Sequence, residues 1–259
     1  MTAFICNMSM FFGGLLTGSF IGVCIYRIPQ GQSVVLGLSF CDNCKASLRW
    51  PYKFPILGYL LLRGRSRCCK QPIPSRYLVL EIVSGVLFLL LFWHFGSDIR
   101  LFSAILLGAL LTIATFIDLS HRIIPDKITL TGILSGLLLA GAGPSHDLAG
   151  ALTGTAVCGG FLYLGGWLGE VLFKKPDAMG GGDIKLAAMI GAFLGWQAGL
   201  LAVTVAAFAG TVAGLVQILV KGYSAATRKV PFGPFLALGA LVVLLWEREL
   251  LMWCFSLSE

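Results

Sequence analysis

Residues 179–199 read "MGGGDIKLAAMIGAFLGWQAG". This stretch places an aspartate and a lysine directly after three glycines and then continues with an apolar segment. The whole chain of 259 residues is 57% hydrophobic and only 12% charged, whereas about a quarter of the residues of a soluble domain are charged. We therefore interpret the chain as an all-α, polytopic membrane protein in which the few buried charges need a reason.

Apolar segments of about 17–25 residues are needed to cross the hydrocarbon of a bilayer. The sequence predicts about eight transmembrane helices, at residues 3–26, 77–96, 101–119, 127–143, 148–173, 184–196, 198–220 and 234–254. The sixth segment is short for a full crossing, so we expect it to be half-broken or shielded by its neighbours. The first segment does not have the pattern of a cleaved signal peptide, because no Lys or Arg precedes it and its apolar region is too long.

The basic residues indicate the orientation. If the N-terminus lies outside, the loops at 27–76, 120–127, 174–185 and 221–233 lie in the cytoplasm, and of the 19 Lys and Arg residues only Arg100 and Arg248 lie outside. This distribution agrees with the positive-inside rule and places both termini outside. The net charge of +7 therefore reflects topology and attraction to anionic lipid, and we expect no nucleic-acid partner.

Three regions follow from this pattern. Residues 1–28 form the first transmembrane helix, residues 29–76 form a small cytoplasmic domain that contains four cysteines, and residues 77–259 form the transmembrane core. Within the core, the spacing of Gly191, Gly195 and Gly199 predicts close packing of helices.

The cytoplasmic domain contains two pairs of cysteines, Cys41 and Cys44 in "CDNC" and Cys68 and Cys69 in "RCC". Two thiolate pairs at this separation are typical of a small zinc-ribbon-like site, in which the metal replaces a hydrophobic core. A disulfide is disfavoured because the cytoplasm is reducing. Adjacent cysteines are unusual in such a knuckle, so four reduced thiols remain the alternative.

Three aspartates stand out at the cytoplasmic ends of the predicted spans: Asp118, Asp126 and Asp183. One packing of the helices would place Asp118 and Asp183 across a cleft, where two carboxylates could share one proton as aspartyl proteases require. The glycines at 180–182 would let a substrate backbone lie close to Asp183. Lys185 would either favour the charged form of Asp183 or anchor the helix end. Paired aspartates also serve proton relays in transporters, so both functions stay open at this point.

Five segments resemble, in order, the motifs of the type IV prepilin peptidases, a family of leader peptidase/N-methyltransferases within the GxGD intramembrane aspartyl proteases. They are "GSFIGVCIYRIP" (18–29), "CDNC" (41–44), "LLRGRSRCCKQPIPSRYLVLE" (61–81), "DLSHRIIPD" (118–126) and "GGGDIKL" (180–186). The resemblance covers nearly the whole chain, and it makes residues 77–259 the peptidase core.

The resemblance implies that Asp118 and Asp183 are the catalytic pair. It places Gly180, Gly181, Gly182, Lys185 and Asp126 around them as supporting residues. The implied substrates are type IV prepilins and the pseudopilins of type II secretion, cut after a glycine at the cytoplasmic face of the bacterial inner membrane. The new N-terminus would then be methylated from S-adenosylmethionine, and zinc would be held by Cys41, Cys44, Cys68 and Cys69.

The chain departs from the family pattern at two positions. Ser66 stands where the second Cys-x-x-Cys pair of the family would begin, so either Cys68 is the fourth ligand in an altered knuckle geometry, or the metal is held by three thiolates or is absent. Gly22 stands where the family has an asparagine. Besides the transporter, a peptidase that has lost methylation is therefore the alternative within the family.

Overall fold

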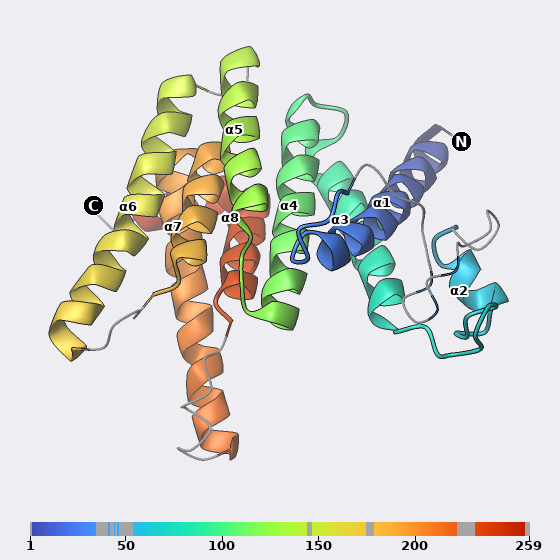
Figure 1. The fold of residues 1–259 in the computed structure, drawn as a ribbon. Coiled ribbons are helices and arrows are strands. Elements are labelled where there is room, and N and C mark those ends of the chain that lie inside the picture. The colour runs from blue at the N-terminus through green and yellow to red at the C-terminus, as the bar shows by residue number, and fades with distance from the viewer. Residues whose placement is uncertain are drawn as a thin grey trace. The chain divides into compact units, whose positions relative to one another are not determined.

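A computed structural model of the protein describes residues 2–34, 41, 44, 46, 54–143, 147–174, 179–221 and 231–256 (Figure 1). Within these ranges the regular elements are α-helices, as the sequence predicts, together with one isolated antiparallel bridge between Arg65 and Pro72. The helices are α1 (Thr2–Arg27), α2 (Leu57–Leu61), α3 (Arg76–Phe95), α4 (Arg100–His121), α5 (Asp126–Ala142), α6 (Leu148–Phe173), α7 (Gly181–Lys221) and α8 (Gly233–Ser256).

The chain forms two compact units. Unit 1 is Met1–Leu101 and contains α1, α2 and α3, whereas unit 2 is Phe102–Glu259 and contains almost all of α4 together with α5 to α8. The division into residues 1–28, 29–76 and 77–259 stays a prediction. Each unit is described by itself below.

In unit 1, α1 and α3 pack with their backbones in close contact. A Cβ atom on Gly14 would lie 2.6 Å from the carbonyl oxygen of Ser84, and one on Gly18 would lie 2.8 Å from the Cα atom of Glu81. Small residues allow this approach where lipid supplies no hydrophobic drive for helix association. At Gly22, a Cβ atom would lie 3.2 Å from the Tyr77 ring, so an asparagine there would need that ring to move.

In unit 2, the long helix α7 is interrupted at Gly195, where φ is 77° and ψ is 179°. This conformation is essentially restricted to glycine. A Cβ atom on Gly199 would lie 3.1 Å from the Cα atom of Gly191, whereas eight residues of a straight helix would separate these positions by about 12 Å. The chain therefore reverses at Gly195, and the two arms of α7 lie side by side (Figure 1).

Helix α6 packs against both arms of α7. A Cβ atom on Gly154 would lie 2.7 Å from the carbonyl carbon of Gly195, and Cys158 Sγ occupies the space beside Gly191 and Gly199. The three glycines of α7 therefore pack closely, as predicted. They do not form one continuous stripe, because the turn at Gly195 places Gly191 and Gly199 on different arms.

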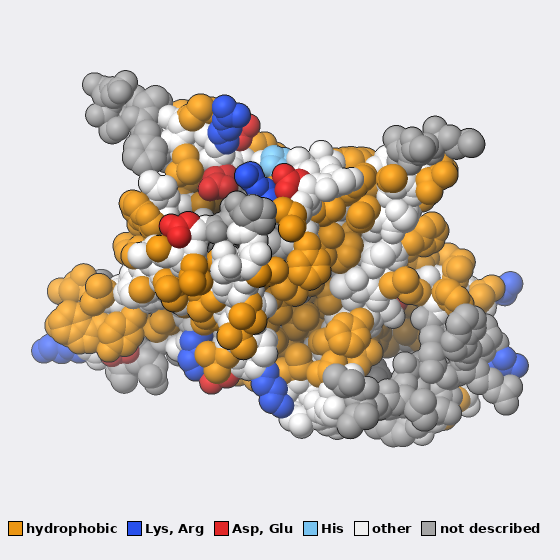
Figure 2. All heavy atoms as spheres, turned by 90° about the horizontal axis from the view of Figure 1, so that it is seen from above, with side chains coloured by type: hydrophobic (Ala, Val, Ile, Leu, Met, Phe, Trp, Pro, Cys, Tyr) orange, Lys and Arg blue, Asp and Glu red, His pale blue; other side chains and the backbone are white. Residues whose placement is uncertain are grey.

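Among the residues that the structure describes, five helices are long and apolar enough to cross a membrane: Phe4–Arg27, Arg76–Phe95, Arg100–His121, Leu148–Leu172 and Gly181–Val220. The predicted number of eight spans is not confirmed. Helix α5 has only 17 residues, and α8 carries Glu247, Arg248 and Glu249 near its end. Hydrophobic side chains cover much of the surface seen in Figure 2, as expected of a protein in contact with lipid.

Candidate active site and metal site

Asp118 lies in the last turn of α4, and only 5% of its surface is exposed. The backbone leaves the helix directly afterwards, because Arg122 adopts a φ of 54°. The Asp118 carboxylate accepts a hydrogen bond from the backbone N–H of Gly233, with 2.9 Å between Oδ2 and N. Burial of a carboxylate is costly unless such donors are supplied, so this contact stabilises a charge on Asp118.

The donor belongs to the first turn of α8. The carbonyl of Phe232 accepts the first hydrogen bonds of the helix, from Phe235 and Leu236. Pro234 has no N–H, and a proline is well tolerated in the first turn because the N–H there would lack a helical partner. The N–H of Gly233 is thus left to bond outside the helix, and Asp118 accepts it.

Gly233 is required by space as well as by its N–H. A Cβ atom at this position would lie 2.7 Å from Asp118 Oδ2. Gly233 was not among the site residues that the sequence predicts. The available signal was "PFGP" at 231–234, where a proline just inside a helix start marks the first turn.

Asp183 lies in the first turn of α7, and its N–H bonds to the carbonyl of Gly180 at 3.0 Å. The three glycines before it are not equivalent. A Cβ atom on Gly180 would lie 2.9 Å from Asp183 Oδ2, and one on Gly182 would lie 2.9 Å from the Cβ atom of Ile124, whereas Gly181 has nothing within 4 Å. Gly180 and Gly182 are therefore needed for packing, and Gly181 is open.

The two aspartates come together at the starts of two helices. Asp118 faces the N-terminus of α8, and Asp183 lies in the first turn of α7. They are close enough to interact electrostatically. Helix N-termini carry a partial positive charge, so this arrangement offsets part of the repulsion between the two carboxylates.

Lys185 and Asp126 form an ion pair, with 2.6 Å between Nζ and Oδ1. Both side chains are exposed, at 43% and 59%, and such a pair contributes about 0–1 kcal/mol. Of the two roles that the sequence left open for Lys185, the geometry favours the anchor, because the pair connects the first turn of α7 to the first turn of α5.

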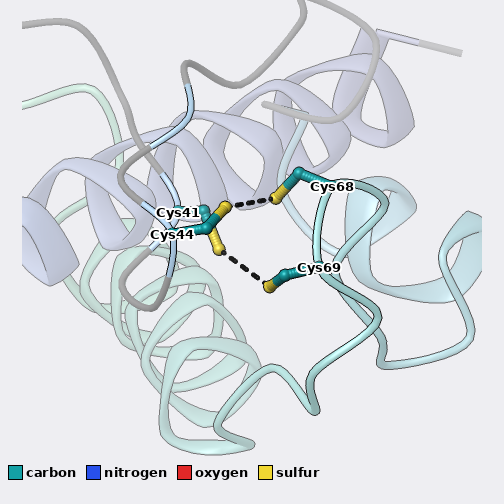
Figure 3. A group of neighbouring side chains, drawn as sticks. All are labelled: Cys41, Cys44, Cys68 and Cys69. Carbon is teal, nitrogen blue, oxygen red and sulfur yellow. Dashed lines mark hydrogen bonds between the residues drawn. The ribbon is translucent and has the colours of Figure 1, made fainter.

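The four predicted cysteine ligands come together in unit 1 (Figure 3). Their sulfur atoms all lie within 4.8 Å of one another. The distances are 3.1 Å between Cys44 and Cys68 and 3.7 Å between Cys41 and Cys69. A tetrahedral zinc ion with Zn–S bonds of about 2.3 Å needs its sulfurs about 3.8 Å apart, so small shifts would fit the cluster to zinc.

Ser66 lies inside this cluster instead of outside it. Its Oγ atom is 2.9 Å from Cys68 Sγ and 3.3 Å from Cys41 Sγ, and the residue is buried. The hydroxyl contact and the contact with Cys44 lower the pKa of the Cys68 thiol, whereas hydrogen bonding to Cys68 raises the pKa of Cys44 to about 12. These contacts favour the thiolate form of Cys68 over that of Cys44.

The sequence matches two families. Residues 12–95 match the family described as "Bacterial Peptidase A24 N-terminal domain", and residues 105–215 match the "Type IV leader peptidase family". The second range contains both Asp118 and Asp183. No solved structure matches the chain.

Three relatives carry the name "Prepilin leader peptidase/N-methyltransferase". The one from Klebsiella pneumoniae is 37% identical over 75% of this chain and 88% of its own length. The one from Legionella pneumophila is 33% identical over 92% of this chain and 91% of its own length. The one from Pseudomonas aeruginosa is 31% identical over 92% and 89%.

We expect the Cys68→Ser variant to lose bound zinc, because it removes one of four sulfurs. The double variant Ser66→Cys/Cys68→Ser should recover zinc, since it restores a thiolate at a position that already lies within the cluster. Ser66→Ala is the control and should retain one zinc ion per chain. Metal content of the purified proteins, measured by mass spectrometry, tests this. Full zinc content in Cys68→Ser would exclude Cys68 as a ligand.

Proposed function

Because this chain belongs to the type IV leader peptidase family, we propose that it is an intramembrane aspartyl endopeptidase that removes the leader peptide of prepilins and then methylates the new N-terminus. The observation that carries the peptidase assignment is the convergence of Asp118 and Asp183 at two helix starts within the matched peptidase segment. The transporter alternative has no support from either family or from the relatives.

In the proposed reaction the two carboxylates share one proton. The ionised carboxylate takes a proton from a water molecule, and the resulting hydroxide attacks the carbonyl carbon of the scissile peptide bond. The protonated carboxyl gives its proton to the carbonyl oxygen. The tetrahedral intermediate then collapses, the C–N bond breaks, and the amine leaves with a proton returned from the pair.

The substrate segment would reach Asp183 past the glycines. Gly181 is the open one of the three, so we place the extended backbone of the substrate beside it, where main-chain hydrogen bonds could form as in strand addition. Gly180 leaves room for the Asp183 carboxylate, and Gly182 leaves room for the side chain of Ile124. Asp126 and Lys185 hold the start of α7 in place.

The relatives' name includes a methyltransferase, and S-adenosylmethionine is the methyl donor that we propose. The cysteine cluster would hold a structural zinc ion that stabilises the loop between α1 and α3.

We further propose pseudopilins as substrates, the bacterial inner membrane as the location, both termini outside, and the cysteine domain and aspartates on the cytoplasmic side. The placement of the Lys and Arg residues supports this orientation.

The Asp118→Asn and Asp183→Asn variants should each abolish cleavage of a prepilin by the purified protein in liposomes, because an amide cannot exchange the shared proton. Gel mobility of the substrate gives the measurement. Asp98→Asn, in the loop between α3 and α4, is the matched control and should leave cleavage unchanged. Undiminished cleavage by both of the first two variants would rule out the aspartate pair.

The Gly233→Ala variant should lower kcat for cleavage by about a hundredfold, because a misplacement of about 1 Å at a catalytic group has costs of this size. KM for the prepilin should change little, since the added methyl group would displace Asp118. Gly214→Ala is the control: it lies in α7 with nothing within 4 Å of the added Cβ atom. A fall in both variants, or a rise in KM alone, would contradict the positioning of Asp118 by Gly233.

Methylation is tested apart from cleavage with a pilin whose N-terminus is already free. We expect the wild-type protein to transfer a radiolabelled methyl group from S-adenosylmethionine to this mature pilin. A pilin with an acetylated N-terminus is the control and should take up no label. If the free pilin also takes up none while prepilin is still cleaved, the peptidase-only alternative holds.

A further inference from the structure

Helix α2 exposes three leucines although it lies outside the membrane-spanning helices. Leu57, Leu60 and Leu61 have 55%, 60% and 67% of their surfaces exposed. Their spacing of i, i+3 and i+4 places them on one face of the helix. We call these three residues the α2 leucine face. Tyr59 of the same helix points elsewhere, since its ring packs beside Gly64.

The start of α2 is tied to a membrane-spanning helix. The N–H of Ile56, just before α2, donates to Oε2 of Glu81 at 2.8 Å. Glu81 is the sixth residue of α3, which begins at Arg76, so this contact lies about 7.5 Å along the helix axis from the first residue of α3. The start of α2 therefore lies beside the second turn of α3, within the apolar span of that helix.

Two further observations make this contact a structural anchor. Glu81 also packs against α1, where a Cβ atom on Gly18 would lie 2.8 Å from its Cα atom, so this residue connects three elements of unit 1. Ile56 has a φ of 58°, a conformation that is strained for a β-branched residue. The surrounding contacts must hold this residue in place, and the position of α2 follows from it.

The surface around α2 has the character of a lipid boundary. On α3, the exposed residues near Glu81 are also apolar: Val79, Ile82 and Val83. After α2 the chain continues with the exposed cations Arg63, Arg65 and Lys70. Apolar residues followed by basic residues at the edge of a span match the order of acyl chains and anionic headgroups in a leaflet.

We propose that the α2 leucine face inserts into the bilayer leaflet at which α3 begins, with Arg63, Arg65 and Lys70 directed to anionic phospholipid headgroups. Lipid is the occupant that the geometry favours over a protein partner, because the anchor to Glu81 sets α2 at the level of the α3 span. This role is independent of the proposed peptidase activity. It would fix the cysteine domain against the membrane surface.

Photocrosslinking tests the proposal without a substrate. The photoreactive amino acid p-benzoylphenylalanine replaces Leu60 or Leu61 in the full-length protein, which is placed in vesicles of phosphatidylethanolamine and phosphatidylglycerol, and adducts are identified by mass spectrometry. We expect phospholipid adducts at both positions. The same substitution at Tyr59 is the matched control, and it should give fewer lipid adducts than positions 60 and 61, because this side chain is only partly exposed and lies beside Gly64.

A second arm tests the basic residues. With the photoreactive residue at position 60, phosphatidylglycerol adducts should exceed their share of the lipid mixture. The variant Arg63→Gln/Arg65→Gln/Lys70→Gln should lose this excess, while lipid adducts as such remain. Adducts to a second copy of the chain, or no lipid adduct at positions 60 and 61, would overturn the proposal. An unchanged phosphatidylglycerol excess would overturn the role of the three cations.

Discussion

The packing of unit 2 depends on the need of the buried Asp118 carboxylate for a hydrogen-bond donor, which the N–H of Gly233 supplies. A carboxylate removed from water needs donors, and in a bundle of apolar helices the available donors are the unpaired N–H groups at helix starts. Helix α8 supplies one such group to Asp118, while Asp183 lies in the first turn of α7. The two carboxylates, which share one proton in the proposed reaction, can then lie near each other because each is close to the positive end of a helix. The positions of α4, α7 and α8 are thus coupled through the chemistry of the site.

Glycine makes this arrangement sterically feasible. Gly233 leaves room for the Asp118 carboxylate, Gly180 leaves room for that of Asp183, and Gly195 lets α7 fold back on itself. Lipid drives helix association only weakly, so bundle stability relies on close backbone contacts of this kind. The same residue type therefore serves both packing and chemistry, and a single methyl group would disturb either one.

The cysteine cluster could hold a metal ion although its spacing in sequence departs from the family pattern. The hydroxyl of Ser66 lies where the family pattern expects a sulfur, and Cys68 from the same turn lies within reach of Cys44. Because zinc requires four donors at the correct distance and not a fixed spacing in sequence, the adjacent cysteines can complete the set. Ser66 then contributes a hydrogen bond to the thiolate instead of a metal bond.

The helical membrane class, the four candidate cysteines and the two candidate aspartates could be predicted from the sequence, because they depend on composition and on charges that an apolar chain otherwise avoids. The sequence identified the helix interruption only as a span too short to cross, and it did not identify Gly233, since a glycine among prolines carries no charge to mark it. The partner of Lys185, the place of Ser66 within the sulfur cluster and the bond from Ile56 to Glu81 were decided only by the tertiary structure. Each of these depends on a contact between segments far apart in the chain, and local sequence patterns do not encode such distances.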